Sequence, residues 1–268
     1  MIIDFHTHIF PEKIAKGTID QLEKVGGIKA SANGTLDGLK RSMKEAGIGL
    51  SVVLPVVTKP GQFETINNYA AQITGKDGII SFGGIHPDTE DYRGQLDYIH
   101  KLGLKGIKLH PDYQGTWIND EKYIRIIRYA MELGLLVSIH SGVDIGLPGT
   151  VHCAPKMAAD MLDRTGADEF GNPQIILAHT GGWNCWDDVE HYLTGRNVLF
   201  DISFSLGYIR EEQLLRIIRN HGADKILFAT DCPWGSQKET VDAFRRLAVT
   251  VEEAEKIWYK NGKRLLGL

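Results

Sequence analysis

Eight short apolar runs, separated by longer helical stretches, are the feature that most limits how this chain can fold. Each run is rich in Ile, Leu, Val or Phe almost continuously, as expected of a parallel strand covered on both faces. Strand and helix in alternation, eight times over, predict a closed (β/α)₈ (TIM) barrel, because an open doubly wound sheet usually has fewer strands. The runs are residues 2–6, 49–56, 78–85, 106–110, 135–140, 174–179, 197–202 and 225–230.

The stretches between the runs have helical spacing. Leu36, Leu39 and Met43 recur at three- and four-residue intervals before Gly47, which is a plausible helix stop. We expect residues 11–31 to be an insertion after the first strand and residues 251–266 to be an extra C-terminal helix packed outside the barrel. No linker or low-complexity segment divides the chain, and α/β barrels take about 250 residues, so residues 1–268 are predicted to be one domain.

Composition narrows the class of partner. The net charge is −4, with 43% hydrophobic and 24% charged residues, so no basic surface points to nucleic acid or an anionic membrane. The N-terminal MIIDFHTHIF does not have the pattern of a signal peptide, and no apolar run reaches the roughly 18 residues of a membrane span. Three cysteines with no disulfide or zinc-finger spacing favour a reducing compartment. We therefore expect a cytoplasmic protein.

Polar side chains gather where the predicted strands end, which is where barrels of this kind form their active sites. Asp201 ends the seventh run and Asp231 follows the eighth, while Lys108 lies at the end of the fourth. Most of the ten histidines lie at such ends, namely His6, His8, His86, His110, His140 and His179. A purely structural distribution would not concentrate imidazole on one rim.

Five of these positions suggest a shared cation. His6 and His8 are two residues apart, which places both imidazoles on one face of a strand. Asp231 directly follows a buried run, and a buried carboxylate is costly without a partner. His140 and His179 each end an apolar run and precede glycines that allow sharp turns and close approach of a ligand. The alternative for each histidine is a hydrogen-bonded strand end or a satisfied core side chain, and for Asp231 it is a helix N-cap or a loop anchor.

Taken together, the motifs resemble the amidohydrolase superfamily, and most closely its amidohydrolase-related (amidohydrolase 2) family of metal-dependent TIM-barrel hydrolases. The matching segments are DFHTH at 4–8, GIKLHP at 106–111, IHSG at 139–142, LAHTGG at 177–182 and FATDCP at 228–233. Each segment is short, but their order along the chain is specific.

The resemblance implies a zinc-type ion held by His6, His8, His140 and Asp231, with His179 as a further ligand or as an acid/base group. Imidazole and carboxylate ligands suit Zn²⁺, and Mn²⁺ or Fe²⁺ would also fit. In two-metal members a lysine at the position of Lys108 is carboxylated and bridges both ions. We favour one ion, with two if Lys108 is carboxylated; otherwise this lysine would bind a substrate carboxylate or pair with Asp231.

The expected activity is hydrolysis of an ester, lactone or amide bond of a small molecule by metal-activated water, as in a lactonase. Asp231 would accept the proton of the water, and His179 or the metal would stabilise the oxyanion. The alternative is metal-dependent non-oxidative decarboxylation of an aromatic or unsaturated acid, although Lys108 and the short chain favour hydrolysis. A third hypothesis is a non-catalytic binding protein that retains the barrel.

The predicted substrate-binding residues are the polar and aromatic side chains that follow strand ends. Aromatic loop residues could form a wall for a planar or apolar ligand, and an arginine could hold a carboxylate. These residues are Lys108, His110, Trp117, Trp183, Trp234 and Arg210. The partner is thus a small molecule, and both a monomer and a homodimer, which is common among relatives, fit the sequence.

Overall fold

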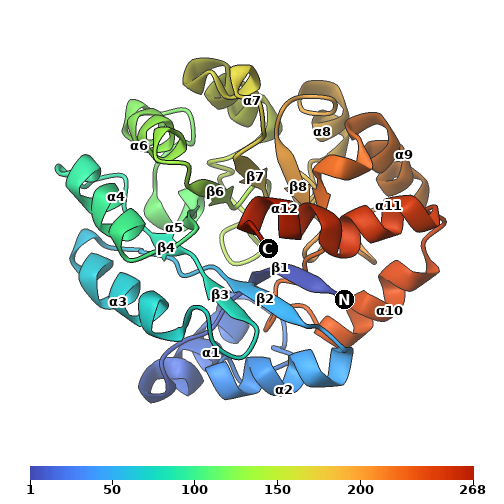
Figure 1. The fold of residues 1–268 in the computed structure, drawn as a ribbon, viewed down its shortest axis with the longest axis horizontal. Helices are drawn as coiled ribbons and strands as arrows, with labels where there is room; N and C mark the ends of the chain where they lie inside the picture. The colour runs from blue at the N-terminus through green and yellow to red at the C-terminus, as the bar shows by residue number, and fades with distance from the viewer.

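The computed structural model describes residues 1–268 and has the predicted barrel of parallel strands inside a ring of helices (Figure 1). Each of the eight apolar runs contains a strand, and the third run contains two. The strands are β1 (Ile3–Thr7), β2 (Leu50–Val53), β3 (Ile79–Ser81), β4 (Gly83–Gly84), β5 (Gly106–Leu109), β6 (Leu136–Ile139), β7 (Ile175–Leu177), β8 (Leu199–Asp201) and β9 (Ile226–Leu227).

The third run is divided because a side chain takes the place of a neighbouring strand. The Asn67 side-chain oxygen accepts a hydrogen bond from the Gly84 N–H at 3.0 Å, and its amide donates to the Gly84 carbonyl at 2.9 Å. A β-carbon at Gly83 would lie 2.4 Å from the Asn67 side-chain oxygen, so glycine is required beside it. β3 and β4 therefore occupy one position of the barrel.

Hydrogen bonds between the two ends of the chain close the barrel. β1, β2 and β3 pair in order, as do β4 to β9, all in parallel. The Phe5 N–H donates to the Phe228 carbonyl at 2.9 Å, and the Asp231 N–H donates to the His6 carbonyl at 2.8 Å. The segment that carries Asp231 is thereby fixed directly beside β1.

Helices connect the strands and surround them. The segment after β1 forms the helix α1, in agreement with the predicted insertion there. The helices are α1 (Glu12–Gly26), α2 (Leu36–Ala46), α3 (Phe63–Ile73), α4 (Tyr92–Lys101), α5 (Pro111–Gln114), α6 (Glu121–Glu132), α7 (Pro155–Thr165), α8 (Trp186–Tyr192), α9 (Glu211–His221), α10 (Gln237–Arg246), α11 (Val251–Glu255) and α12 (Asn261–Leu266), with a π-helical turn at Lys256–Lys260 and 3₁₀ turns at Pro60–Gln62, Ala167–Glu169 and Ala223–Lys225.

The extra C-terminal helix differs from the prediction in its position. Figure 1 shows α12 crossing the centre of the barrel rather than lying on its outer wall. Leu266 joins the apolar cluster inside the barrel, and a β-carbon at Gly262 would lie 3.2 Å from Ile3. The C-terminal segment covers the amino end of the barrel because that end would otherwise expose the interior side chains to water.

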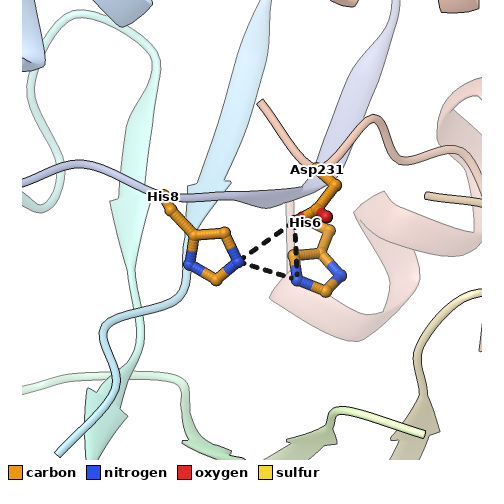
Figure 2. Close-up of side chains that lie close together, drawn as sticks. All are labelled: His6, His8 and Asp231. Carbon is orange, nitrogen blue, oxygen red and sulfur yellow. Dashed lines mark hydrogen bonds and ion pairs between the residues drawn. The ribbon is translucent and has the colours of Figure 1, made fainter. Parts of the chain in front are cut away.

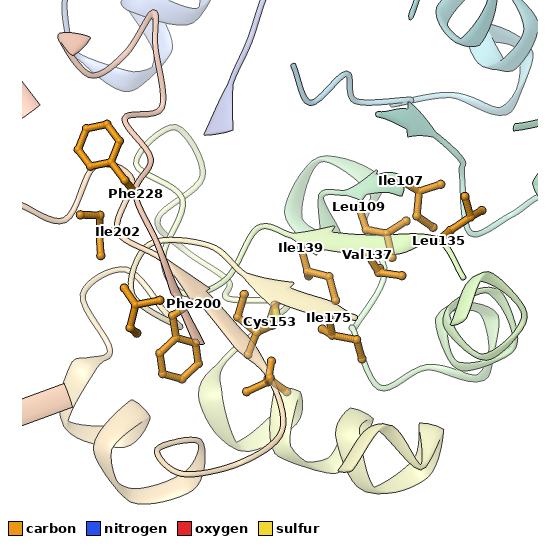
Figure 3. Packing of buried hydrophobic residues seen from close by; sticks show 14 of the residues in the cluster. Ile107, Leu109, Leu135, Val137, Ile139, Cys153, Ile175, Phe200, Ile202 and Phe228 are labelled. Carbon is orange, nitrogen blue, oxygen red and sulfur yellow. The ribbon is translucent and has the colours of Figure 1, made fainter. Parts of the chain in front are cut away.

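Two apolar clusters follow from the alternation of side chains along each strand. A cluster of 51 buried residues lies between the strands and the helices, and Figure 3 shows Ile107 and Leu109 packed there beside Val137 and Ile139. A smaller cluster of 12 buried residues fills the barrel interior. Lys108 lies between Ile107 and Leu109, so it points the other way, into the barrel. The charged site is thus built on the inner face of the strands.

Candidate metal centre and active site

Three side chains from the two ends of the chain converge at the carboxyl end of the barrel. The Nε2 atoms of His6 and His8 are 3.1 Å apart. Asp231 Oδ1 lies 3.5 Å from His6 Nε2 and 3.1 Å from His8 Nε2 (Figure 2). These three donor atoms all lie within 4.8 Å of one another, as ligands of one ion must. The sequence motif and the sheet closure together explain this placement.

The hydrogen bonds of the two imidazoles show what the cluster can bind. His8 Nδ1 lies 2.8 Å from the Leu54 carbonyl, which only accepts, so His8 carries its proton on Nδ1. His6 Nδ1 lies 2.9 Å from Asp201 Oδ2, which favours the same tautomer. Both Nε2 atoms therefore direct lone pairs at each other and at a carboxylate oxygen. Such a donor set fits a divalent cation, with Asp201 and Leu54 as its outer hydrogen-bond partners.

Lys108 lies next to this cluster, inside the barrel. Its Nζ atom is 3.2 Å from His6 Nε2, and the side chain is almost completely buried. Burial lowers the pKa of Lys108 to about 8, although the carboxylates of Asp201 and Asp231 act in the opposite direction. The amine is therefore placed to contact either an ion bound at His6 or a negatively charged group of a substrate.

His179 and His140 continue the line of imidazoles across the barrel. His179 Nε2 lies 3.1 Å from His140 Nδ1, and the His179 ring centre is 5.3 Å from that of His6. His179 Nδ1 lies 3.0 Å from the Ser203 carbonyl, so its Nε2 atom carries a lone pair. The structure thus brings His6, His8 and Asp231 together directly, while His179 adjoins them and His140 lies one ring further.

His140 also belongs to a second group of potential ligands. The His140 Nε2 atom lies 3.9 Å from Asp144 Oδ2 and 4.0 Å from Asp112 Oδ2. Neither His140 Nε2 nor Asp112 Oδ2 has a hydrogen-bond partner. His110 stacks on His140 with ring centres 4.2 Å apart, and its Nε2 atom is 3.5 Å from Asp144 Oδ2. Burial and neighbouring positive groups hold the pKa of both imidazoles well below the usual value. The neutral rings are available as ligands or as hydrogen-bond partners.

The Asp231 carboxylate is held in its charged form. Burial acts to raise its pKa, but the close contacts with the imidazoles of His6 and His8 outweigh this effect, so the pKa lies below its usual value. Burial and Lys108 in turn lower the pKa of His6 well below 6.5. A negative carboxylate beside neutral imidazoles is the electrostatic arrangement that a cation site requires.

A cavity of about 740 Å³ opens from this cluster. Of the predicted substrate-binding residues, Lys108, His110, Trp183 and Trp234 line it. The other two predicted residues, Trp117 and Arg210, are not part of its lining. Trp117 is 43% exposed and packs against His152, with ring centres 4.6 Å apart. Arg210 is an exposed residue at the start of α9.

The comparisons with known proteins agree with this geometry. The family model described as Amidohydrolase matches residues 3–268. The chain belongs to the amidohydrolase family. No curated protein matches the chain. Among solved structures, an uncharacterized TIM-barrel protein from Bordetella bronchiseptica is similar, with 19% identity, a TM-score of 0.81 and coverage of 99% of this chain and 98% of that one.

Two other similar structures are named for an activity. A dihydroxybenzoic acid decarboxylase from Polaromonas sp. JS666, with bound manganese and the inhibitor 2-nitroresorcinol, has 16% identity, a TM-score of 0.70 and coverage of 100% and 97%. A 5-carboxyvanillate decarboxylase from Sphingomonas paucimobilis has 14% identity, a TM-score of 0.68 and coverage of 100% and 99%. These likenesses establish the fold, and membership in the amidohydrolase family establishes a metal-dependent enzyme. No helix of this family member is long and apolar enough to cross a membrane.

Asp201 is a further buried residue of the site of this amidohydrolase-family protein, and the sequence motifs assign it no role. Its Oδ2 atom meets His6, while Oδ1 accepts from the N–H groups of His179 and Ser203 and from the Ser203 hydroxyl. One carboxylate therefore positions two of the predicted metal-site histidines. The available signal was a buried Asp at the end of the seventh run, in the same kind of position as Asp231.

Gly142, which follows β6, makes the predicted sharp turn, but it lies against backbone rather than a ligand. We expected Gly142 to leave room for a ligand, but a β-carbon there would lie 2.1 Å from the Trp183 backbone nitrogen. The backbone φ of Gly142 is +86°, and its neighbour Val143 donates its N–H to the Trp183 carbonyl at 2.9 Å. Gly142 thus joins the loop after β6 to the loop after β7, which brings Trp183 to the cavity wall.

Proposed function

We propose that this amidohydrolase-family protein is a metal-dependent, non-oxidative decarboxylase of an aromatic or unsaturated carboxylic acid. The observation that carries the proposal is the distribution of charge in the cavity. Lys108, Asp144 and Asp231 are the only Lys, Arg, Asp or Glu side chains that line it, and all three lie at the end formed by the histidines. The names of the two similar decarboxylases add support.

The chain's own residues suggest how an acid would be held. The carboxylate would contact the buried Lys108 amine, because a charged donor in a dry site binds an anion strongly. The ring would lie against Trp183, Phe204 and Trp234, which line the cavity. Moving a carboxylate from water into this environment favours its loss as neutral carbon dioxide.

His6, His8 and Asp231 would hold one divalent ion, with His179 and His140 as further ligands. Zn²⁺, Mn²⁺ and Fe²⁺ all accept such a set, and manganese is bound in a similar structure. When bound, the ion supplies positive charge that neutralises the substrate carboxylate and a neighbouring oxygen. Carboxylation of Lys108 would add a ligand between the set of His6, His8 and Asp231 and the pair of His179 and His140, and it would favour a second ion.

Asp231 is the residue placed to move a proton. It would carry a solvent proton to the ring carbon that bears the carboxylate, and the bond from that carbon to the carboxylate then breaks. The electron pair of the broken bond returns to the ring, and carbon dioxide leaves. One proton is consumed and no oxidant is needed.

The experiment that tests the proposal follows the fate of carbon and solvent. Purified protein loaded with Mn²⁺ or Zn²⁺ is incubated with hydroxybenzoic and unsaturated acids in deuterated water. We expect release of carbon dioxide and one deuterium at the former carboxyl position, with both lost in Asp231→Asn. Incorporation of solvent oxygen into a product carboxylate, with no carbon dioxide, would refute decarboxylation.

Lys108 favours a second candidate, hydrolysis of a lactone, ester or amide. Its amine lies 3.2 Å from His6 Nε2 and lines the cavity together with His140 and His179, where a carboxylated lysine would act as a bridging ligand. In that reaction Asp231 would take the proton of the attacking water and pass it to the leaving group. Water labelled with heavy oxygen separates the two candidates, because only hydrolysis places the label in the product.

A further inference from the structure

The cavity is much larger than the reacting part of a simple aromatic acid requires. A cavity of roughly 150 Å³ is enough to hold a benzene ring, whereas this one measures about 740 Å³. Its charged end occupies only the region of the histidines, Lys108, Asp144 and Asp231. The rest of the cavity is therefore available to another part of the ligand.

The helix α1 forms one side of this part of the cavity. Ile14, Leu22 and Val25 lie on one helical face and line the cavity, while Ala15 and Ile19 are buried on another. Ile14 and Val25 are each 53% exposed, which is unusual for large apolar side chains that face inward. The same face carries the uncharged polar residues Thr18 and Gln21, so it is mostly apolar and has no charge, yet no other side chain of the protein covers it completely.

The helix α3 lines another part of the same cavity. Ile66, Tyr69 and Ala70 line the cavity, and burial raises the pKa of Tyr69, so its hydroxyl is neutral at physiological pH. Neither α1 nor α3 contributes a lysine, arginine, aspartate or glutamate to the lining. A second charged group of a ligand placed here would find no partner and would be desolvated at a cost.

The far end of α1 keeps this space connected to the charged site. A β-carbon at Gly26 would lie 3.7 Å from Ile145 Cδ1, and one at Gly146 would lie 3.3 Å from Val25 Cγ1. Ile145 and Gly146 follow Asp144, whose carboxylate approaches His110 and His140. A single ligand could therefore reach from the histidines to α1 without leaving the cavity.

We propose that the substrate is a monoacid with a long, uncharged apolar extension, an alkyl chain or a second ring, which lies between α1 and α3. The inference rests on the proposed function for the acid group alone. The apolar faces of α1 and α3 bind the extension by removing it from water. Substrates with a second carboxylate at the far end are disfavoured because that end has no cation.

The test measures binding separately from turnover. Dissociation constants of 2-hydroxybenzoic acid and its homologues with a hexyl group at ring position 4, 5 or 6 are measured by calorimetry on the Mn²⁺-loaded protein. Each buried methylene multiplies affinity by about fourfold, so burial of only about half of the hexyl chain should make the best homologue bind about 100-fold more tightly than the parent acid. Equal affinities, or no binding by any homologue, would overturn the proposal.

Matched variants show which part of the cavity wall provides the gain in affinity. Ile14→Asp places a charge in the apolar wall, and Ile66→Trp fills the space, so each should remove most of the gain while the parent acid binds as before. Gly17→Asp adds the same charge to α1 where nothing lies within 4 Å, and it should keep the gain. A gain that survives both wall variants would refute the assignment. Tight binding of homologues without carbon dioxide release would refute the decarboxylase function and leave this inference standing.

Discussion

His6 Nδ1 lies 2.9 Å from Asp201 Oδ2, and both side chains are buried within the barrel. The carboxylate therefore fixes the ring orientation and directs the His6 Nε2 lone pair at the site shared with His8 and Asp231. Carboxylates that accept from a ligating imidazole raise its basicity and hold its tautomer. Asp201 is thus a positioning residue, although it has no direct place in the donor set.

We expect Asp201→Asn to weaken binding of Mn²⁺ or Zn²⁺ by about 10–100-fold, because the amide removes the charge that supports His6. Titration calorimetry of the metal-free protein measures the change. Asp20→Asn, at an exposed position on α1, is the control and should bind metal as the wild type does. An unchanged dissociation constant in Asp201→Asn would contradict a role in metal binding.

Removal of the ion should lower thermal stability. A ligand at 100 times its dissociation constant stabilises the native state by about 2.7 kcal/mol, which corresponds to a rise in Tm of roughly 5–10 °C for a chain of this size. Differential scanning calorimetry with chelator and then with added Zn²⁺ or Mn²⁺ measures the shift. His6→Ala should abolish it. If added metal leaves the wild-type Tm unchanged, the hypothesis of a non-catalytic barrel gains support.

Lys108→Met tests which of two roles this residue has. If the amine binds the substrate carboxylate, the variant should raise KM by roughly 10–100-fold and leave the metal affinity unchanged. If Lys108 is carboxylated and bridges two ions, the metal content measured by mass spectrometry should fall instead. Lys105→Met, an exposed position just before β5, is the control for the loss of one positive charge.

Much of the fold could be predicted because continuous apolar runs are a strong signal for parallel strands. All eight runs contain strands, and the residues after them form the site. The pairing register of β1 with β2, however, shifts between Asp4 and Thr7, so that Phe5 and His6 both contact groups inside the barrel. Strict alternation would have placed them on opposite faces, and nothing in the sequence marks the irregularity.

The candidate site was predictable as a set of residues but not as an arrangement. The two-residue spacing placed His6 and His8 on one face of a strand, and closure of the barrel placed Asp231 beside them. The position of His140 depends on rotamers and ring contacts that the local sequence does not encode. The loop residues were the least predictable, because Trp117 and Trp183 follow strands in similar ways and yet only Trp183 reaches the cavity. The close backbone contact at Gly142 decides that difference.

His221 should make stability depend on pH, far from the metal site. Its Nε2 atom lies 2.8 Å from the Val198 carbonyl and its Nδ1 accepts from the Gly195 N–H, so the folded protein holds the neutral ring. Burial lowers the pKa of His221 to about 3. The unfolded chain takes up the proton near pH 6.5, so stability is complete above that value and falls as the pH drops toward 3, by up to about 1.4 kcal/mol per unit.

Urea unfolding from pH 4 to pH 7.5 measures this slope. His221→Gln should be less stable at neutral pH, because one of the two hydrogen bonds is lost, but its free energy of unfolding should fall less steeply with acid. Other buried histidines contribute equally to both proteins, so the difference in slope isolates His221. His191→Gln, at an exposed position, should follow the wild-type curve. Parallel curves for the wild type and His221→Gln would contradict the assignment.

Gly142→Ala should be strongly destabilising and should also disturb the cavity. The added methyl group would meet the Trp183 backbone at 2.1 Å, and a φ of +86° disfavours any side chain. We expect a loss of about 2–4 kcal/mol in the free energy of unfolding, measured by urea denaturation. Gly61→Ala is the matched control, since a β-carbon there has nothing within 4 Å, and its stability should stay within about 1 kcal/mol of the wild type. Equal stability of the two variants would show that the loops after β6 and β7 can separate at little cost, and Trp183 would then be a mobile wall of the cavity rather than a fixed one.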